Sequence, residues 1–241
     1  MSFDVIVPVG PNDIAIFEKQ IEYTKKNIIG YRNIYAIVSK NVYNRTDCIF
    51  IDESIFPFSL EDVSKIHGKN SRNGWYLQQL LKLYAGFVIP DILERYLVID
   101  CDTFFLKPTK FIENDKCLYN YGLEYHIEYF QHMVKLHPSL TKQINTMSGI
   151  SHHMMFEKKY ISELFDLVEK NNNSKFWEVF LEQVDKSQVL HSGASEYEIY
   201  FNFLIKYHFS DIGIRYLNWN NTTVFPVTED IDYVSWHWYL R

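Results

Sequence analysis

The first part of the chain alternates between short apolar runs and segments with helical spacing. Residues 3–9 are apolar and rich in β-branched side chains, which predicts a buried strand that runs into a loop. Residues 14–28 place apolar side chains at helical spacing, and residues 33–39 and 48–52 are again strand-like. This alternation of strands and helices is typical of a doubly wound parallel sheet. We therefore expect an α/β fold.

A loop and a second helix lead to the most informative strand. Residues 52–74 have the composition of a loop that is locally basic. Residues 75–88 carry a helical stripe of leucines and tyrosines that ends before Pro90. An apolar run then ends in the acidic pair Asp100 and Asp102, which places this pair at the end of a predicted strand.

The second half of the chain is expected to be α+β, because the alternation weakens after Pro108. The chain contains no internal repeat and no linker rich in proline, glycine or serine, which favours a single domain over residues 1–241. We divide this domain into a nucleotide-binding half, 1–110, and an acceptor-binding half, 111–241. In the second half, helices are predicted over residues 161–168, 176–184 and 195–208.

The composition is that of a folded globular chain and argues against two classes of partner. Of the 241 residues, 47% are hydrophobic and 22% are charged, which is far from the composition of disordered chains. With 24 basic and 30 acidic side chains, the net charge is −6. The chain as a whole therefore lacks the positive field that would attract nucleic acid or an anionic membrane.

The sequence gives no sign of export or of membrane insertion. Its first residues do not form a basic segment followed by a long apolar one, and no apolar run reaches the roughly 18–20 residues that span a bilayer. The three cysteines, Cys48, Cys101 and Cys117, are an odd number and lack the spacing of a zinc site. We expect reduced thiols and a cytoplasmic protein without a transmembrane segment.

Two carboxylates at the end of an apolar strand indicate a site for a metal and a phosphate. Open α/β sheets bind ligands at the carboxyl edge of their parallel strands. Asp100 and Asp102 repel each other, and a hard divalent cation that also binds phosphate oxygens would keep both ionised. An acidic turn that merely ends the strand is the simpler explanation of the same residues.

A phosphatase is a second enzymatic interpretation of this pattern. Phosphatases with an aspartate nucleophile also carry Asp-x-Asp after an apolar strand. They usually carry it near the N-terminus, whereas about a hundred residues precede Asp102 in this chain. The later acidic pair and lysine that such an enzyme needs are not evident in order, so phosphoryl hydrolysis is the lesser alternative.

Five segments carry a resemblance to a known class of enzymes: Phe3 to Val9, Arg72 to Lys82, Val98 to Thr103, Ser151 to Phe156, and Ser195 to Glu198. Their combination resembles the nucleotide-sugar glycosyltransferases of the GT-A fold, and in particular a family of uncharacterised glycosyltransferase-like proteins of bacteria and large DNA viruses. The resemblance implies a Rossmann-like single domain in which helices flank a mixed central sheet.

The resemblance also implies a reaction. A sugar would move from a nucleotide-sugar donor to the hydroxyl of a glycan or another acceptor, with the help of a divalent metal. A UDP-sugar is the favoured donor, and a GDP-sugar is the alternative. A non-catalytic protein that binds a nucleotide-sugar with the same fold stays open as an alternative.

The same resemblance assigns the metal ligands. Asp100 would lie near the donor ribose and the metal, Asp102 would bind the metal directly, and the late histidine His237 would complete the coordination. An imidazole ligand suits Mn²⁺ better than Mg²⁺. We therefore expect Mn²⁺, with Mg²⁺ as the alternative.

The donor is expected to contact residues from the first half of the chain. A pyrophosphate carries more negative charge than one dication cancels, so a basic side chain should face it. Arg72 is the first choice because it opens a helix whose N-terminus also favours anions. The full set of candidate donor-binding residues is Pro8, Gly10, Asp52, Arg72, Gln78, Lys82 and Asp100.

The acceptor is expected to contact residues from the second half. Ser195 and Glu198 form a capping-box pattern, so Glu198 is expected to cap a helix. Glu196 is then free to point into a cleft and is our candidate general base. Such a base would favour inversion at the anomeric carbon, and a reaction without a base would favour retention.

Two histidines and three tryptophans, Trp219, Trp236 and Trp238, are the remaining candidates for contact with the acceptor or the sugar. His152 and His153 are adjacent, so on a strand one ring would face inward and the other outward. Trp238 carries a large aromatic face of the kind that stacks on sugars.

Overall fold

The computed structural model describes residues 2–39, 45–223 and 230–237. Trp238, one of the tryptophans expected to contact a sugar, lies outside the described residues.

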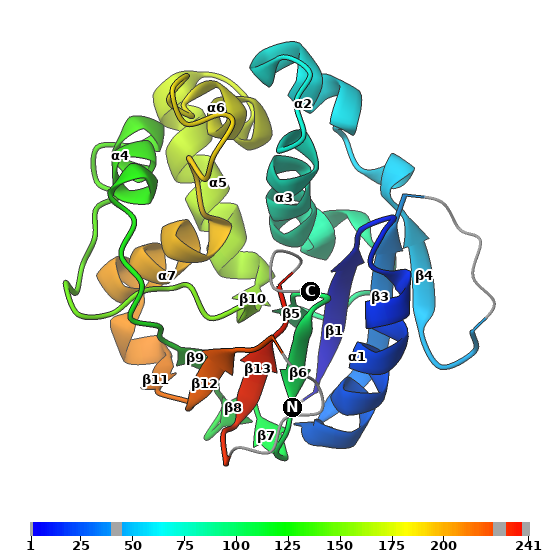
Figure 1. The fold of residues 1–241 in the computed structure, drawn as a ribbon. Coiled ribbons are helices and arrows are strands. Elements are labelled where there is room, and N and C mark those ends of the chain that lie inside the picture. Colours follow the sequence, from blue (N-terminus) through cyan, green and yellow to red (C-terminus); the bar gives the residue numbers. More distant parts are fainter. Residues whose placement is uncertain (1, 40–44, 224–229, 238–241) are drawn as a thin grey trace.

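The centre of the molecule is a five-stranded mixed sheet (Figure 1). Its strand order is β10-β5-β1-β3-β4. Within this sheet, β1, β3, β4 and β5 are parallel to one another, and β10 is antiparallel to its neighbour β5. This sheet confirms the predicted α/β class with a mixed sheet. The strands are β1 (Phe3–Val9), β3 (Tyr31–Val38), β4 (Ile49–Asp52), β5 (Arg95–Ile99) and β10 (His153–Glu157).

The helices predicted from apolar stripes all form, and the helix Ile127–Leu136 forms in addition, where no helix was predicted. Helix α3 packs against β1, β5 and β10, whereas α1 packs against β6 (Thr103–Phe105) and lies in front of β3 in Figure 1. Helices α5 and α6 are separated by a turn in which Asn173 adopts a left-handed conformation, with φ of 53°. The bounds are α1 (Ile14–Asn27), α3 (Asn73–Val88), α4 (Ile127–Leu136), α5 (Lys158–Asn172), α6 (Phe176–Glu182) and α7 (Glu196–Tyr207).

The expectation of a loop over residues 52–74 is wrong in its middle part. The helix α2 (Leu60–His67) forms there, after the short 3-10 turn Glu53–Ile55. Ser59 caps this helix: its hydroxyl accepts a hydrogen bond from the amide of Asp62, and the Asp62 carboxylate accepts one from the amide of Ser59. This reciprocal capping was readable in the sequence as Ser-x-x-Asp before a buried valine.

Small sheets connect the second half of the chain to the central one. β6 pairs with β13 (Tyr233–Ser235), which pairs in turn with β12 (Trp219–Asn221). This pairing carries the C-terminal end of the described chain back to the residues that follow β5. The remaining strands are β2 (Ile28–Ile29), β7 (Thr109–Lys110), β8 (Ile112–Glu113), β9 (Lys116–Asn120) and β11 (Gly213–Arg215), and a 3-10 turn spans Phe209–Asp211.

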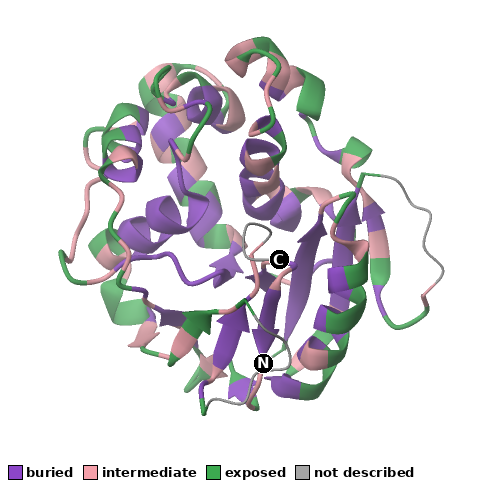
Figure 2. Cartoon of the chain, viewed as in Figure 1, coloured by how far each residue is buried: buried purple, intermediate pink, exposed green. Residues whose placement is uncertain are grey.

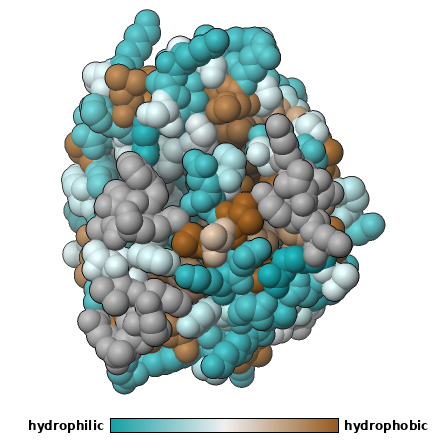
Figure 3. Space-filling model, turned by 45° about the vertical axis from the view of Figure 1, so that its right-hand side comes forward, coloured by the Kyte–Doolittle hydropathy of each residue, from teal (hydrophilic) through white to brown (hydrophobic). Residues whose placement is uncertain are grey.

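The buried residues are concentrated in the central sheet. The central strands are almost entirely buried, and the exposed residues gather on the outer faces of helices and on loops (Figure 2). Burying one large apolar side chain contributes roughly 1.5–3 kcal/mol, so these strands hold much of the stabilising free energy. The face in Figure 3 is largely hydrophilic, with hydrophobic residues in separate small groups.

Two further features concern the cysteines and the lengths of the helices. Among the described residues, Cys48, Cys101 and Cys117 are buried and form no disulfide. Across the described ranges, every helix is too short or too polar to cross a membrane.

Candidate active site

Antiparallel pairing of β10 with β5 brings the acidic pair and the two histidines to one edge of the sheet. His153, the first residue of β10, is paired with Ile99, the last residue of β5. The amide of Asp100 donates a hydrogen bond to the carbonyl of His152 at 2.9 Å. Residues some fifty positions apart in sequence therefore meet where the parallel strands β1, β3, β4 and β5 end, which is the ligand-binding edge of such sheets.

Asp100 is held by three side chains. Its Oδ1 atom lies 2.5 Å from the ammonium of Lys82 and accepts a hydrogen bond from the Tyr197 hydroxyl at 2.9 Å. Its Oδ2 atom lies 3.6 Å from Nδ1 of His152. Burial alone would raise the pKa of Asp100, but the charge of Lys82 and the contact with His152 lower it well below its ordinary value. Asp100 is thus an anion with a fixed orientation.

Lys82 owes its position to a close approach between α3 and β5. A Cβ atom on Gly86 would lie 2.7 Å from Cε1 of Tyr96, so only glycine lets α3 approach this closely. The Tyr96 hydroxyl donates to the carbonyls of Lys82 and Leu83, both at 3.2 Å. Lys82 is consequently fixed over the end of β5, with only 4% of its side chain exposed.

The Lys82 ammonium also binds Glu196, at 2.7 Å. The expectation that Glu196 points freely into a cleft is wrong, because only 3% of this residue is exposed and its carboxylate faces Lys82. Burial raises the pKa of Glu196, an effect that Lys82 opposes and Asp100 reinforces. Its role as a general base stays a prediction.

Glu198 is buried and does not complete the predicted capping box. The Ser195 hydroxyl accepts a hydrogen bond from the amide of Glu198, as expected for a helix cap. The carboxylate of Glu198, however, accepts hydrogen bonds from Ser148 and Asn202. It ties α7 to the chain before β10.

Asp102 faces His237 across the small sheet. Ser235 pairs with Thr103, and the amide of Trp236 donates to the carbonyl of Asp102 at 2.8 Å. Nδ1 of His237 then lies 3.4 Å from Oδ2 of Asp102. Burial would lower the pKa of His237, but the hydrogen bond and charge of Asp102 raise it.

The donor set beside Asp102 suits a hard cation that keeps positions open for a ligand. One carboxylate and one imidazole lie together, and Mg²⁺ or Mn²⁺ commonly takes one or two protein groups and completes its shell with phosphate oxygens and water. Within the described part of the chain, no group of three or more His, Cys, Asp or Glu side chains is arranged to hold a metal by itself. Asp100 is turned toward Lys82 instead.

The two adjacent histidines are both buried, so the predicted alternation of one inward and one outward ring is wrong. His152 precedes the strand with φ of 59°, a left-handed conformation, which turns its ring toward those of Trp219 and His237, at centroid distances of 4.8 and 4.6 Å. Nε2 of His152 is buried and has no hydrogen-bond partner among the described residues.

His153 is packed among aromatic rings. Its ring lies 4.9 Å from those of Phe105 and Tyr233 and 5.5 Å from that of Phe111. Burial, reinforced by the charge of Arg215, lowers the pKa of His153 to about 3. The structure therefore places His153 in the core beneath the site, while its predicted contact with an acceptor stays a prediction.

The candidate donor-binding residues divide into two groups. Pro8, Gly10 and Asp52 lie at the ends of β1 and β4, on the same edge of the sheet as Asp100. Asp52 also accepts a hydrogen bond from the amide of Ser54 at 2.8 Å. Gln78 lies on α3 and is half-buried.

Arg72 is bound elsewhere. It lies ten residues before Lys82, which is about 15 Å along a helix. Its guanidinium donates to the carbonyl of His191 at 2.9 Å and to the hydroxyl of Ser192 at 3.0 Å, and it stacks on Trp75 at 4.3 Å. The structure thus brings Lys82, and not Arg72, to the acidic pair.

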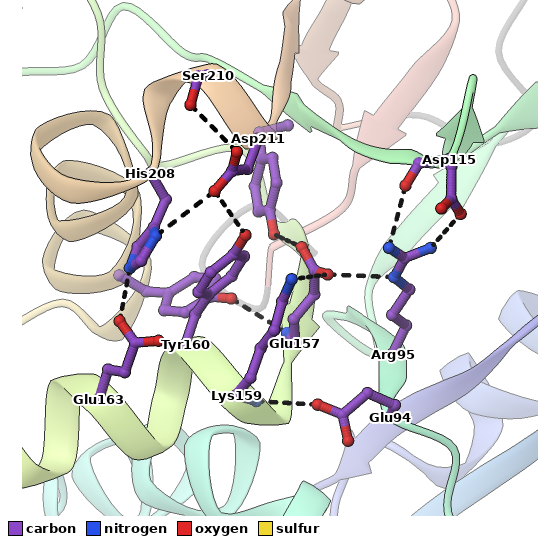
Figure 4. Close-up of polar contacts among 12 residues, drawn as sticks. Glu94, Arg95, Asp115, Glu157, Lys159, Tyr160, Glu163, His208, Ser210 and Asp211 are labelled. Carbon is purple, nitrogen blue, oxygen red and sulfur yellow. Dashed lines mark hydrogen bonds and ion pairs between the residues drawn. The ribbon is translucent and has the colours of Figure 1, made fainter.

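A second polar cluster lies at the opposite edge of the sheet (Figure 4). Arg95 pairs with Glu157 at the far ends of β5 and β10, four residues and about 13 Å from Ile99. Arg95 also reaches Asp115, and Tyr160 reaches Asp211. These contacts join β5 and β10 to the neighbouring loops, a structural role distinct from the acidic edge.

Tyr197 and a cavity beside the site were not predicted from the sequence. Tyr197 follows Glu196 directly, and its hydroxyl is a partner of Asp100. The cavity has a volume of about 380 Å³ and lies between the segment after β9 and strand β12. Its lining residues are Leu123, Glu124, Tyr216, Trp219, Asn220 and Asn221.

The fold is similar to those of two solved glycosyltransferases. The galactosyltransferase LgtC, solved in complex with donor and acceptor sugar analogues, superimposes with a TM-score of 0.50 at 12% identity, over 97% of this chain and 86% of that chain. Mouse xyloside xylosyltransferase 1 in its apo form gives a TM-score of 0.49 at 9% identity, over 100% and 99% of the two chains. The likeness to LgtC supports the expected GT-A-type fold.

Similarity at the level of sequence is narrower. A search of curated proteins finds no match. The model of a family of unknown function, DUF6492, matches residues 14–222, and the chain belongs to this family.

Proposed function

We propose that this protein is a glycosyltransferase that moves a sugar from a nucleotide-sugar donor to an acceptor hydroxyl. The observation that carries the proposal is the contact of Asp102 with His237, next to the fixed carboxylate of Asp100, at the carboxyl edge of a sheet with this fold. Ligands of open α/β sheets bind at that edge, and paired carboxylates there suit a diphosphate with a cation.

We place the metal at Asp102 and His237. Their oxygen and nitrogen donors fit Mn²⁺, or Mg²⁺ as the alternative, and leave coordination positions for phosphate oxygens. When bound, the metal would neutralise the diphosphate and the charge that develops on the departing nucleotide. Asp100 would lie at the border of this shell, as an oriented anion facing the donor ribose.

Lys82 sets the charge and direction of Asp100. Its single positive charge is shared between Asp100 and Glu196, so the three groups carry one net negative charge in a buried site. An ionised carboxylate accepts hydrogen bonds and donates none, which suits the hydroxyls of a ribose or a sugar. Tyr197 and Lys82 both bind Oδ1, and this fixes the other oxygen, Oδ2, on the His152 side.

The stereochemistry depends on Glu196. With its carboxylate paired to Lys82, Glu196 serves as an acceptor base only if the acceptor hydroxyl reaches this pair. A base at that position favours inversion at the anomeric carbon, and a reaction that needs no base favours retention.

We favour sugar transfer over phosphoryl hydrolysis. A nucleophilic aspartate needs an oxygen open to the phosphorus, whereas Oδ1 of Asp100 is bound by both Lys82 and Tyr197 and the side chain is only 17% exposed. The likeness of the fold to a galactosyltransferase supports the same choice.

A screen of UDP- and GDP-sugars, with Mn²⁺ or Mg²⁺ added, tests the proposal. Release of the nucleoside diphosphate is measured for the wild type, for Asp102→Asn and for Asp166→Asn, whose carboxylate lies on the exposed face of α5. We expect metal-stimulated release that falls at least a hundredfold in Asp102→Asn and stays at the wild-type level in Asp166→Asn. Equal release by all three proteins would remove Asp102 from the site.

A further inference from the structure

We propose that the cavity beside His152 is the binding site for the acceptor, and that it takes an uncharged glycoside. This inference rests on the proposed glycosyltransferase function and adds the chemical class of the acceptor. The cavity volume of about 380 Å³ is at the lower end of the range of small-ligand pockets, which suits one or two sugar units.

The side chain of His152 connects the cavity with the acidic edge of the sheet. The ring of Trp219, which lines the cavity, lies 4.8 Å from the ring of His152. His152 in turn lies 3.6 Å from Asp100 through its Nδ1 atom, and its ring lies 4.6 Å from that of His237. A sugar in the cavity would therefore present a hydroxyl toward the carboxylates that we assign to the donor.

The walls offer aromatic and apolar faces. Trp219 is held in one orientation by stacking on Tyr233, with an interplanar angle of 8° and a centroid distance of 5.5 Å. Tyr216 and Leu123 are 47% and 70% exposed, which is high for side chains of this size. The C–H face of a pyranose ring packs on such surfaces, and a rigid aromatic wall loses little entropy on binding.

The polar groups of the cavity are one carboxylate and the amides of β12. Glu124 binds His126 through one oxygen, at 3.0 Å, and a carboxylate accepts several hydrogen bonds from sugar hydroxyls. Asn220 and Asn221 supply amides that can donate and accept. Such mixed donors and acceptors recognise hydroxyl groups.

Charge decides between neutral and acidic sugars. None of the described lining residues is a lysine or arginine, and Glu124 is the charged side chain among them. An acidic sugar or a phosphorylated sugar would be repelled by this carboxylate, and no described lysine or arginine in the lining would offset the repulsion. The cavity therefore discriminates in favour of uncharged glycosides.

Ligand-observed NMR tests the site without depending on turnover. The probes are methyl β-galactoside, methyl β-glucoside and lactose, with methyl β-glucuronide as the acidic comparison. The protein samples are the wild type, Tyr216→Ala and Glu124→Gln, with Phe209→Ala and Glu61→Gln as controls at exposed positions on other elements. Thermal unfolding of every variant shows whether it is folded.

We expect saturation transfer from the wild type to at least one neutral glycoside, at least a tenfold loss of affinity in Tyr216→Ala and Glu124→Gln, and wild-type affinity in both controls. The glucuronide should give no signal. Failure of every neutral probe, equal affinity in all variants, or preferential binding of the glucuronide would overturn the inference.

A parallel measurement separates this inference from the proposed function. Nucleotide release from UDP- and GDP-sugars is recorded for the same wild-type preparation. Glycoside binding without donor turnover would support the cavity as a sugar site and count against the transferase. Donor turnover together with glycoside binding that is unchanged in Tyr216→Ala and Glu124→Gln would support the transferase and count against the cavity as the acceptor site.

Discussion

The ammonium of Lys82 lies 2.5 Å from Oδ1 of Asp100, although the two residues belong to a helix and to the end of a strand. The same ammonium lies 2.7 Å from Glu196 on a second helix. One buried cation therefore joins three elements at the edge where we place the donor. Its removal leaves two carboxylates facing each other in a buried site.

Replacing this cation should destabilise the protein. In Lys82→Met, Asp100 and Glu196 lose their shared partner, and breaking a buried ion pair on one side costs about 3–5 kcal/mol. For a domain of this size we expect the melting temperature to fall by at least about 6 °C. The loss should be smaller in Lys82→Arg, which keeps the charge. Lys65→Met, an exposed change on α2, serves as the control. An unchanged melting temperature in Lys82→Met would contradict the buried network.

The close approach of α3 to β5 gives a prediction about two glycines of one helix. In Gly86→Ala the new methyl group would lie 2.7 Å from Tyr96, and such overpacking costs about 1–3 kcal/mol. At Gly74, near the start of the same helix, a methyl group meets no atom within 4 Å. Alanine is the better helix former, so Gly74→Ala should be neutral or stabilising by up to about 1 kcal/mol.

Urea unfolding of both glycine variants measures these changes in the free energy of unfolding. Nucleotide release should also fall in Gly86→Ala, because a displaced α3 moves Lys82 away from Asp100. Equal stability of the two variants would contradict a close approach of α3 to β5 at Gly86.

Local patterns in the sequence predicted the parts of the site that a single element creates. The apolar run before Asp100 predicts a strand, and the carboxylates after a strand must lie at its carboxyl edge. The α/β class follows from the same alternation. Ser59 and Asp62 form a local capping pattern that predicts the start of helix α2, whereas the polar composition around it predicts a loop.

Local patterns do not predict contacts between elements that are far apart in the sequence. Lys82 and Glu196 are separated by 114 positions, and their contact depends on how α3 and α7 pack. The meeting of Asp102 with His237 depends on the pairing of β13 with β6. A helical or strand period reports which face of an element is buried, and it does not report which element covers that face.

Two buried histidines should make the stability of the protein depend on pH. Burial is the main cause that lowers the pKa of His132, to about 4, and of His153, to about 3. In the unfolded chain both would titrate near their ordinary value of about 6.5. Below that value the unfolded state binds more protons than the folded state, so stability is complete above pH 6.5 and falls as the pH drops toward 4.

Each histidine should contribute about 1.4 kcal/mol of lost stability per pH unit in this range. Urea unfolding at pH 7 and pH 5 measures the loss, and His132→Gln should reduce it by about 2 kcal/mol, since one titrating group is removed over about 1.5 units. His191→Gln, at an exposed position, should leave it unchanged. An identical loss in His132→Gln and the wild type would contradict the buried, neutral state of His132.

Removing the hydroxyl of Tyr197 tests the site with less disturbance of the fold than a change of charge. Tyr197→Phe removes the hydrogen bond to Oδ1 of Asp100 and leaves the ring in place over Lys82, so the fold should be retained. A hydrogen bond to a charged group contributes about 1.5–3 kcal/mol, which corresponds to at least about a tenfold effect if it orients Asp100 for the donor.

The control is Tyr160→Phe, which removes a similar hydroxyl–carboxylate bond, to Asp211, at the opposite edge of the sheet (Figure 4). We expect the kcat/KM for nucleotide release to fall at least tenfold in Tyr197→Phe and to stay within twofold in Tyr160→Phe. Equal losses in both variants would mean that Tyr197 supports stability alone, and that the orientation of Asp100 does not depend on it.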